Sequence, residues 1–107
     1  MTGVRQTKAY TATVNRISRR YGVAPVAPGR FVIPAPHMLL RVETTATMAE
    51  ATSELADEAR ASYIVMTNRE GVREAVRAVA GTRVGVMDPY GEIIKPAEGD
   101  GNAREVT

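Results

Sequence analysis

Three short apolar segments alternate with two amphipathic ones between residues 38 and 88, and this alternation constrains the fold more than any other feature. The apolar segments have the length and β-branched content of buried strands. They are MLLRVET (38–44), SYIVMT (62–67) and TRVGVMD (82–88). Because a strand–helix–strand–helix–strand order joins neighbouring strands by right-handed crossovers, we expect these strands to run parallel.

Helix signals separate the three predicted strands. Thr47 and Glu50 have the T-x-x-E spacing of a capping box, which predicts a helix running from there to about Ala61. Asn68 is expected to cap a second helix, which spans 69–80 and ends before a glycine. Each helix therefore stands where a crossover connection between parallel strands is expected.

A third helix is predicted near the N-terminus, over residues 7–21. Its apolar residues recur at the spacing of one helical stripe. They are Tyr10, Val14, Ile17 and Tyr21. Basic residues project from the other side, and Gly22 stands where a left-handed cap would end the helix.

The segment between this helix and residue 38 is rich in proline. In VAPVAPGRFVIPAP (23–36), the dipeptide Pro28-Gly29 predicts a turn, so the flanking VAPVA and RFVI are expected to form an edge hairpin. EIIK (92–95) is expected to add a short final element. The predicted fold class is α/β, a mixed central sheet with flanking helices in the order α-β-β-β-α-β-α-β. It forms a single domain over 1–95, followed by a flexible polar tail over 96–107.

Composition excludes several classes of site. The chain has no cysteine, which excludes a disulfide framework, a thiolate zinc site and a cysteine nucleophile. No apolar run approaches the roughly 20 residues that span a bilayer, and the N-terminus lacks an apolar signal core. We therefore expect a cytoplasmic protein that has no membrane partner and no cofactor.

Charge is distributed unequally, because no acidic residue precedes Glu43. Residues 1–41 contain seven basic side chains: Arg5, Lys8, Arg16, Arg19, Arg20, Arg30 and Arg41. Residues 42–107 contain seven basic and twelve acidic side chains, so the two parts carry +7 and −5. Such asymmetry indicates an anionic partner, unless the two parts neutralise each other within the fold or across a subunit contact.

The first functional hypothesis is a non-catalytic nucleic-acid-binding module. Its candidate phosphate contacts are Lys8, Arg16, Arg19, Arg20, Arg30 and Arg41. The alternative is a small protein-interaction or assembly component, such as a viral or mobile-element accessory protein. Its basic part would then meet the acidic part of a second copy or of another protein, which allows a homo-oligomer.

Two stretches, residues 38–59 and 59–88, resemble the core of the restriction-endonuclease-like superfamily. The likeness is closest to methylation-dependent restriction endonucleases and extends to archaeal Holliday-junction resolvases. It lies in a strand, the helix behind it, a strand ending in threonine, an Ala-rich helix and a strand ending in Asp. The resemblance implies an α/β nuclease core in which acidic side chains on and before the central strand hold a divalent metal.

The positions that this resemblance makes catalytic are not filled. The family places Asp, Glu or Gln two residues ahead of a lysine, whereas this chain has Arg41 and Glu43 there. If Glu43 is taken as the ligand, Thr45 stands at the lysine position, and no acid lies upstream. Since one carboxylate cannot assemble a magnesium site, we expect no metal site, with Glu43 as the single catalytic candidate. The third hypothesis is a working nuclease in which Glu70 or Asp88 assists Glu43.

Overall fold

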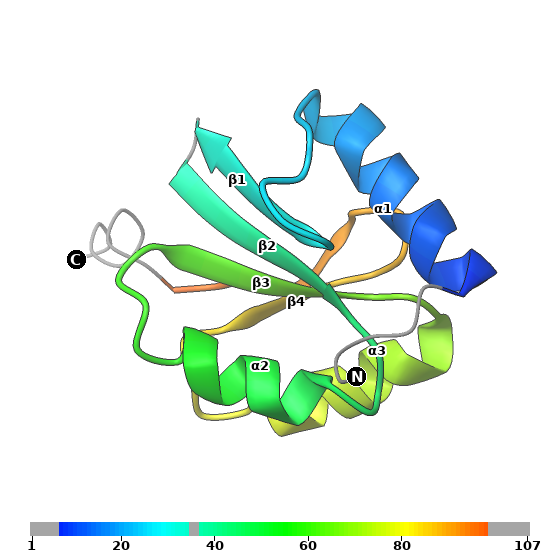
Figure 1. The fold of residues 1–107 in the computed structure, drawn as a ribbon. Helices are drawn as coiled ribbons and strands as arrows, with labels where there is room; N and C mark the ends of the chain where they lie inside the picture. The colour runs from blue at the N-terminus through cyan, green and yellow to red at the C-terminus, as the bar shows by residue number, and fades with distance from the viewer. Residues whose placement is uncertain (1–6, 35–36, 99–107) are drawn as a thin grey trace.

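The computed structural model describes residues 7–34 and 37–98 and contains three helices and five strands (Figure 1). In chain order the elements are α1 (Lys8–Tyr21), β1 (Arg30–Pro34), β2 (His37–Glu43), α2 (Met48–Leu55), β3 (Ala61–Met66), α3 (Arg69–Ala78), β4 (Gly85–Met87) and β5 (Ile93–Lys95). The predicted α/β class and the alternation of strands and helices between residues 38 and 88 are confirmed.

The strands form one mixed sheet whose order in space equals their order in the chain, β1-β2-β3-β4-β5. The three central strands run parallel, as the crossover argument predicts, with Leu40 opposite Tyr63 and Tyr63 opposite Gly85. The two edge strands, β1 and β5, are antiparallel to their neighbours. Each parallel step is made by one crossover helix, α2 or α3, as a parallel connection requires.

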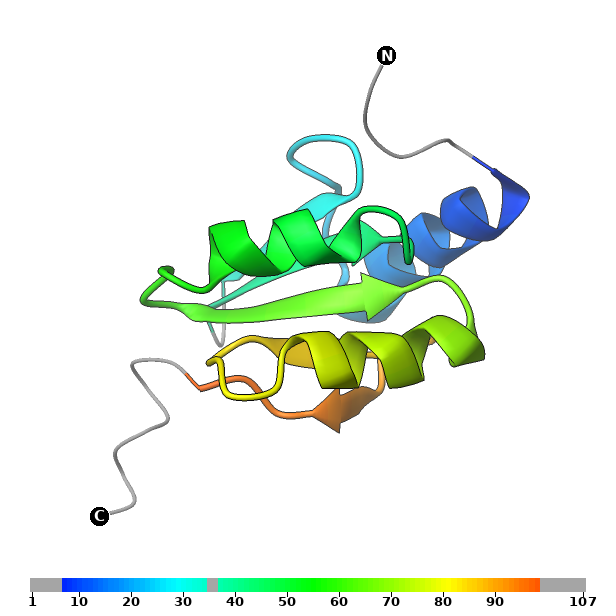
Figure 2. The same cartoon turned by 90° about the horizontal axis from the view of Figure 1, so that it is seen from below.

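The sheet separates two hydrophobic clusters, because successive side chains of a strand point to opposite faces. Helix α1 covers one face, and α2 and α3 cover the other (Figures 1 and 2). The α1 face buries Leu40, Val42, Tyr63, Val65 and Met87 together with Tyr10 and Ile17 of the helix. The opposite face buries Ile64, Met66, Val84 and Val86 against the two crossover helices.

The predicted caps Gly22 and Asn68 are confirmed, and the structure adds Thr7 as the N-cap of α1. The Thr7 side chain accepts a hydrogen bond from the Tyr10 amide at 3.2 Å, and Gly22 ends α1 in the left-handed conformation with φ of 67°. Asn68 Oδ1 accepts a hydrogen bond from the Gly71 amide at 2.6 Å and so begins α3. These local signals therefore set the ends of two helices.

The predicted hairpin within residues 23–36 is wrong. VAPVA forms no strand and makes only an isolated bridge between Ala27 and Arg30. Pro25 and Pro28 lack the amide hydrogens that a strand ladder needs. RFVIP forms β1 instead and pairs with β2, so the element order is α-β-β-α-β-α-β-β rather than the predicted one. Residues 35–36 lie outside the described part.

The predicted capping box and the predicted end of α2 are also wrong. The Thr47 side chain makes no cap hydrogen bond with α2, and its hydroxyl accepts a hydrogen bond from the Thr44 amide at 3.1 Å. Helix α2 ends at Leu55 rather than near Ala61, because Ala61 already begins β3 and five residues are needed to turn the chain. The Glu58 amide donates to the Leu55 carbonyl at 3.0 Å within this turn.

The short final element predicted at EIIK is β5, and the fold continues beyond it. Ala97 is 4% exposed, and its amide donates to the Tyr63 hydroxyl at 3.1 Å. The Glu98 amide donates to the Arg83 carbonyl at 2.9 Å, so Ala97 and Glu98 of the predicted tail are joined to the domain, and 99–107 lie outside the described residues. Within residues 7–34 and 37–98, no helix is long and apolar enough to cross a membrane.

Candidate nucleic-acid interface

Helix α1 presents an exposed side that carries cations and hydrogen-bonding groups. Tyr10, Thr13 and Ile17 are buried, and Val14 packs against the same cluster, so this side of α1 faces the sheet. Lys8, Thr11, Asn15 and Arg19 are exposed, and their spacing places them along one side of the helix. We call these four residues the α1 surface; no acidic residue occurs anywhere in α1.

A shallow hollow of about 370 Å³ lies on the first half of this surface. Its lining is Thr7, Lys8, Thr11, Ala12 and Asn15. Threonine, asparagine and lysine side chains are among the groups that contact phosphate oxygens in protein–DNA complexes. Prediction from charge alone found Lys8 but missed Thr11 and Asn15, although their helical spacing from Lys8 was a usable signal.

Arg16 and Arg20 extend from α1 toward the turn between β4 and β5. The Arg16 guanidinium donates to the Pro89 carbonyl at 3.3 Å and lies 4.7 Å from the centre of the Tyr90 ring. Arg20 donates to the Tyr90 carbonyl at 3.2 Å and forms an ion pair with Glu92 at 3.1 Å. These two arginines therefore fasten α1 to the end of the sheet, which reduces their availability to an external phosphate.

Arg30 and Arg41 lie on the other face of the sheet from α1. They are directly opposite each other in the β1–β2 ladder, and their strand neighbours Phe31 and Leu40 point into the α1 cluster. Arg30 is exposed and has no ion pair within the described residues. Arg41, in contrast, has two carboxylate partners.

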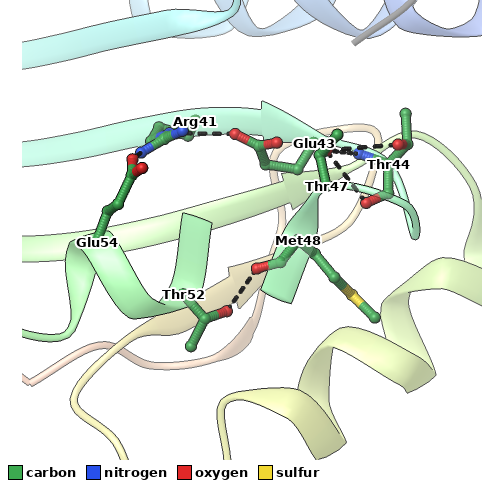
Figure 3. A network of polar contacts seen from close by, with 7 residues as sticks. All are labelled: Arg41, Glu43, Thr44, Thr47, Met48, Thr52 and Glu54. Carbon is green, nitrogen blue, oxygen red and sulfur yellow. Dashed lines mark hydrogen bonds and ion pairs between the residues drawn. The ribbon is translucent and has the colours of Figure 1, made fainter. Parts of the chain in front are cut away.

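Figure 3 shows how Arg41 is held between the two carboxylates. Its Nε donates to Glu43 Oε2 at 3.1 Å, and its Nη1 donates to Glu54 Oε1 at 2.6 Å. The hydrogen bond and the positive charge of Arg41 lower the pKa of the Glu54 carboxyl. Glu43 is itself only 5% exposed, so Arg41 neutralises a buried charge and is not free for a ligand.

The structure therefore does not gather the six predicted cations on one surface. Within the described residues, Lys8 and Arg19 on the α1 surface have no ion pair, whereas Arg16 and Arg20 are engaged at the β4–β5 turn. Arg30 and Arg41 belong to the opposite face of the sheet. Part of the charge asymmetry in the sequence is thus neutralised within the fold, as one of the two interpretations anticipated.

Glu43 does not form part of a metal-binding cluster in the structure. Among residues 7–34 and 37–98, no group of three or more histidine, cysteine or acidic side chains could hold a metal ion. Asp88 Oδ1 accepts hydrogen bonds from the Tyr90 and Glu92 amides at 2.8 and 3.0 Å, so it stabilises a turn. Glu70 lies exposed in the first turn of α3. The arrangement that a third, hydrolytic hypothesis requires is not assembled among these residues.

Comparison of the chain with protein-family models, curated proteins and solved structures finds no match. A functional assignment therefore rests on the chemistry and placement of the residues themselves.

Proposed function

We propose that this protein is a non-catalytic nucleic-acid-binding module that contacts phosphates through the α1 surface. The observation that carries the proposal is an exposed side of α1 on which two cations flank hydrogen-bonding side chains. Neither cation has an ion pair in the part of the chain that the structure describes, and α1 contains no acid. Lys8 and Arg19 are eleven residues apart, which corresponds to about 16 Å along the helix axis. Affinity of this kind is independent of sequence, because phosphate contacts position a protein without reading bases.

The same proposal includes a nuclease-like core that does not hydrolyse nucleic acid. The stretch that resembles restriction-endonuclease-like proteins is the β2–α2–β3–α3–β4 part of the sheet. On β2, the guanidinium of Arg41 forms an ion pair with the carboxylate of Glu43. Glu43 is the single acid that the resemblance would make a metal ligand. A protein cation therefore sits where a metal ion would have to bind.

The number of free cations predicts how binding depends on salt. We count Lys8 and Arg19 as full phosphate contacts and Arg16 as a partial one. A plot of the logarithm of the binding constant against the logarithm of the salt concentration should then have a slope of about −2 to −3. Fluorescence anisotropy with a labelled duplex, from about 50 to 200 mM KCl, measures this slope. We expect Arg19→Ala to make the slope shallower by about one.

Arg77→Ala is the matched control for this experiment. Arg77 also lies in the last turn of a helix and is exposed, but α3 covers the other face of the sheet. The control should therefore keep both the affinity and the slope of the unmodified protein. Absence of binding at low salt, or an equal loss with both variants, would rule out the α1 surface.

A cleavage assay tests the non-catalytic part of the proposal. Supercoiled DNA incubated with the protein and Mg²⁺ or Mn²⁺ should remain uncut, because Arg41 binds both Glu43 and Glu54, and no group of three or more acidic, histidine or cysteine side chains that could hold a metal occurs among the described residues. Gel electrophoresis measures nicked and linear products over time. Metal-dependent cleavage that disappears in Glu43→Ala would contradict this prediction and establish the nuclease hypothesis instead.

A further inference from the structure

The segment between β4 and β5 exposes an unusual concentration of apolar side chains. Five large hydrophobic side chains are exposed in the described part of the chain, and three of them lie within five residues. Tyr90 is 54% exposed, and Ile93 and Ile94 are each 48% exposed. Ile93 and Ile94 are consecutive in β5 and point to opposite faces of the sheet, but both border its open edge. Exposed apolar side chains that are close together commonly mark an interaction site, whereas single ones do not.

The backbone of β5 is also available to a further strand. Among the described residues, β5 is the last strand of the sheet and pairs only with β4. An edge strand offers unpaired amide and carbonyl groups that can bind an added strand. The apolar side chains and the open backbone therefore belong to the same three-residue strand and its preceding turn.

A groove of about 410 Å³ runs between this edge and α3. Arg69 and Arg73, one helical turn apart, line it together with Val72 and Ile94. Both arginines are exposed and have no ion pair within the described residues. Glu70 and Asp88 also line the groove, but the Asp88 carboxylate already accepts two backbone amides of its own turn. The groove thus offers an apolar wall beside two guanidinium groups that lack an ion pair among the described residues, with the exposed Glu70 carboxylate in the same lining.

We propose that the β5 edge binds an extended acidic–apolar peptide segment of a partner protein, which adds a strand to the sheet. Its backbone would pair with β5, an apolar side chain would pack on Ile94 and Val72, and a carboxylate would meet Arg69 and Arg73. This inference goes beyond the proposed function, because it uses different elements from the α1 surface and a different class of partner.

Charge favours such a peptide over a second copy of the chain at this edge. Two copies joined through antiparallel β5 strands would be related by a two-fold axis perpendicular to the sheet, so both α3 helices would lie on one face. Arg69 and Arg73 of each copy would then approach those of the other, and like charges across such a contact are destabilising. An acidic segment meets the same arginines with opposite charge.

Two peptides of equal length test the proposal. The Val-Glu peptide is an octapeptide of two Val-Ser-Glu-Ser repeats, and the Val-Lys peptide has two Val-Ser-Lys-Ser repeats, so that the valine and the charged residue lie on the same face of the added strand. Each is labelled with fluorescein and titrated with the full chain, and anisotropy gives the dissociation constants. We expect the Val-Glu peptide to bind at least about tenfold more tightly than the Val-Lys peptide. Amide hydrogen exchange of the complex should show slower exchange at Ile93–Lys95.

Charge reversal gives the sharper result. In Arg69→Glu/Arg73→Glu, the preference between the two peptides should invert, while Arg77→Glu, on the same helix but outside the groove, should leave it unchanged. Equal binding of both peptides, or no binding of the Val-Glu peptide at millimolar concentration, would overturn the proposal. Sedimentation of the protein without peptide gives a further check. A dimer that Ile94→Arg converts to a monomer would also overturn the proposal, because a second copy would then occupy the edge.

The result of the peptide-binding experiment can be distinguished from the result of the nucleic-acid-binding experiment. Arg19→Ala should leave peptide binding unchanged, since α1 and the groove share no residue. If the Arg69→Glu/Arg73→Glu variant lost binding to duplex DNA instead of changing its peptide preference, the groove would belong to nucleic acid and the peptide proposal would fail.

Discussion

Replacing Gly85 with alanine is expected to lower the free energy of unfolding by about 3 kcal/mol, near the upper end of overpacking effects. A methyl group at this position would lie 2.6 Å from the Ala97 amide nitrogen, from the Lys95 carbonyl oxygen and from the Tyr63 ring. Two of these three contacts are backbone atoms, which cannot move aside without displacing β5 and the segment after it. Urea unfolding followed by circular dichroism measures the change.

The sign of the change in the free energy of unfolding tests the close contacts around Gly85, because Gly85 does not have a positive φ that alanine would strain. Without the close contacts, alanine in a strand would be neutral or stabilising relative to glycine. Gly22→Ala is the control, since Gly22 has φ of 67° but no atom within 4 Å of an added methyl group. It should cost about 1 kcal/mol through backbone conformation alone. A stabilised Gly85→Ala variant would show that the packing of β4 against residues 95–97 is not as described.

Replacing Arg41 with leucine is expected to cost about 3 kcal/mol, because it leaves the buried carboxylate of Glu43 without its partner. The Glu43 side chain is 7% exposed and that of Arg41 is 15% exposed, so water compensates little for the lost ion pair. Glu54→Ala should have a much smaller effect, since Glu54 is 52% exposed and its removal leaves the Arg41–Glu43 pair intact. Urea unfolding at neutral pH measures all of these variants.

A double variant identifies the cause of the Arg41→Leu effect. Arg41→Leu/Glu43→Gln should recover most of the lost stability, because no charge is then buried without a partner. A deficit that persists in the double variant would instead point to lost packing of the arginine stem.

Local patterns predicted much of this fold because the relevant forces act between residues close in sequence. The apolar stripe of α1, the Asn68 cap and the apolar strands between residues 38 and 88 all act within a few residues, and the structure confirms them. The capping box at Thr47, in contrast, failed for a tertiary reason. Thr47 had two possible partners, and tertiary geometry selected the Thr44 amide over the start of α2.

The candidate site was predicted less well because ion pairing depends on side chains far apart in sequence. Arg41 meets Glu54 thirteen residues later, and Arg20 meets Glu92 seventy-two residues later. A linear count of charge does not contain these pairings and therefore overestimates the basic surface. The residues that sequence could have found, Thr11 and Asn15, follow from helical spacing rather than from charge.

The division of the interior into two layers has a consequence for how the chain can be shortened. A polypeptide beginning at Arg30 would keep all five strands and both crossover helices, and its secondary structure could still form. It would nevertheless leave Leu40, Val42, Tyr63, Val65 and Met87 uncovered, because α1 is the one described helix that packs on them. Such a fragment should self-associate through this bare face, so the first helix acts as the solubilising element of the domain.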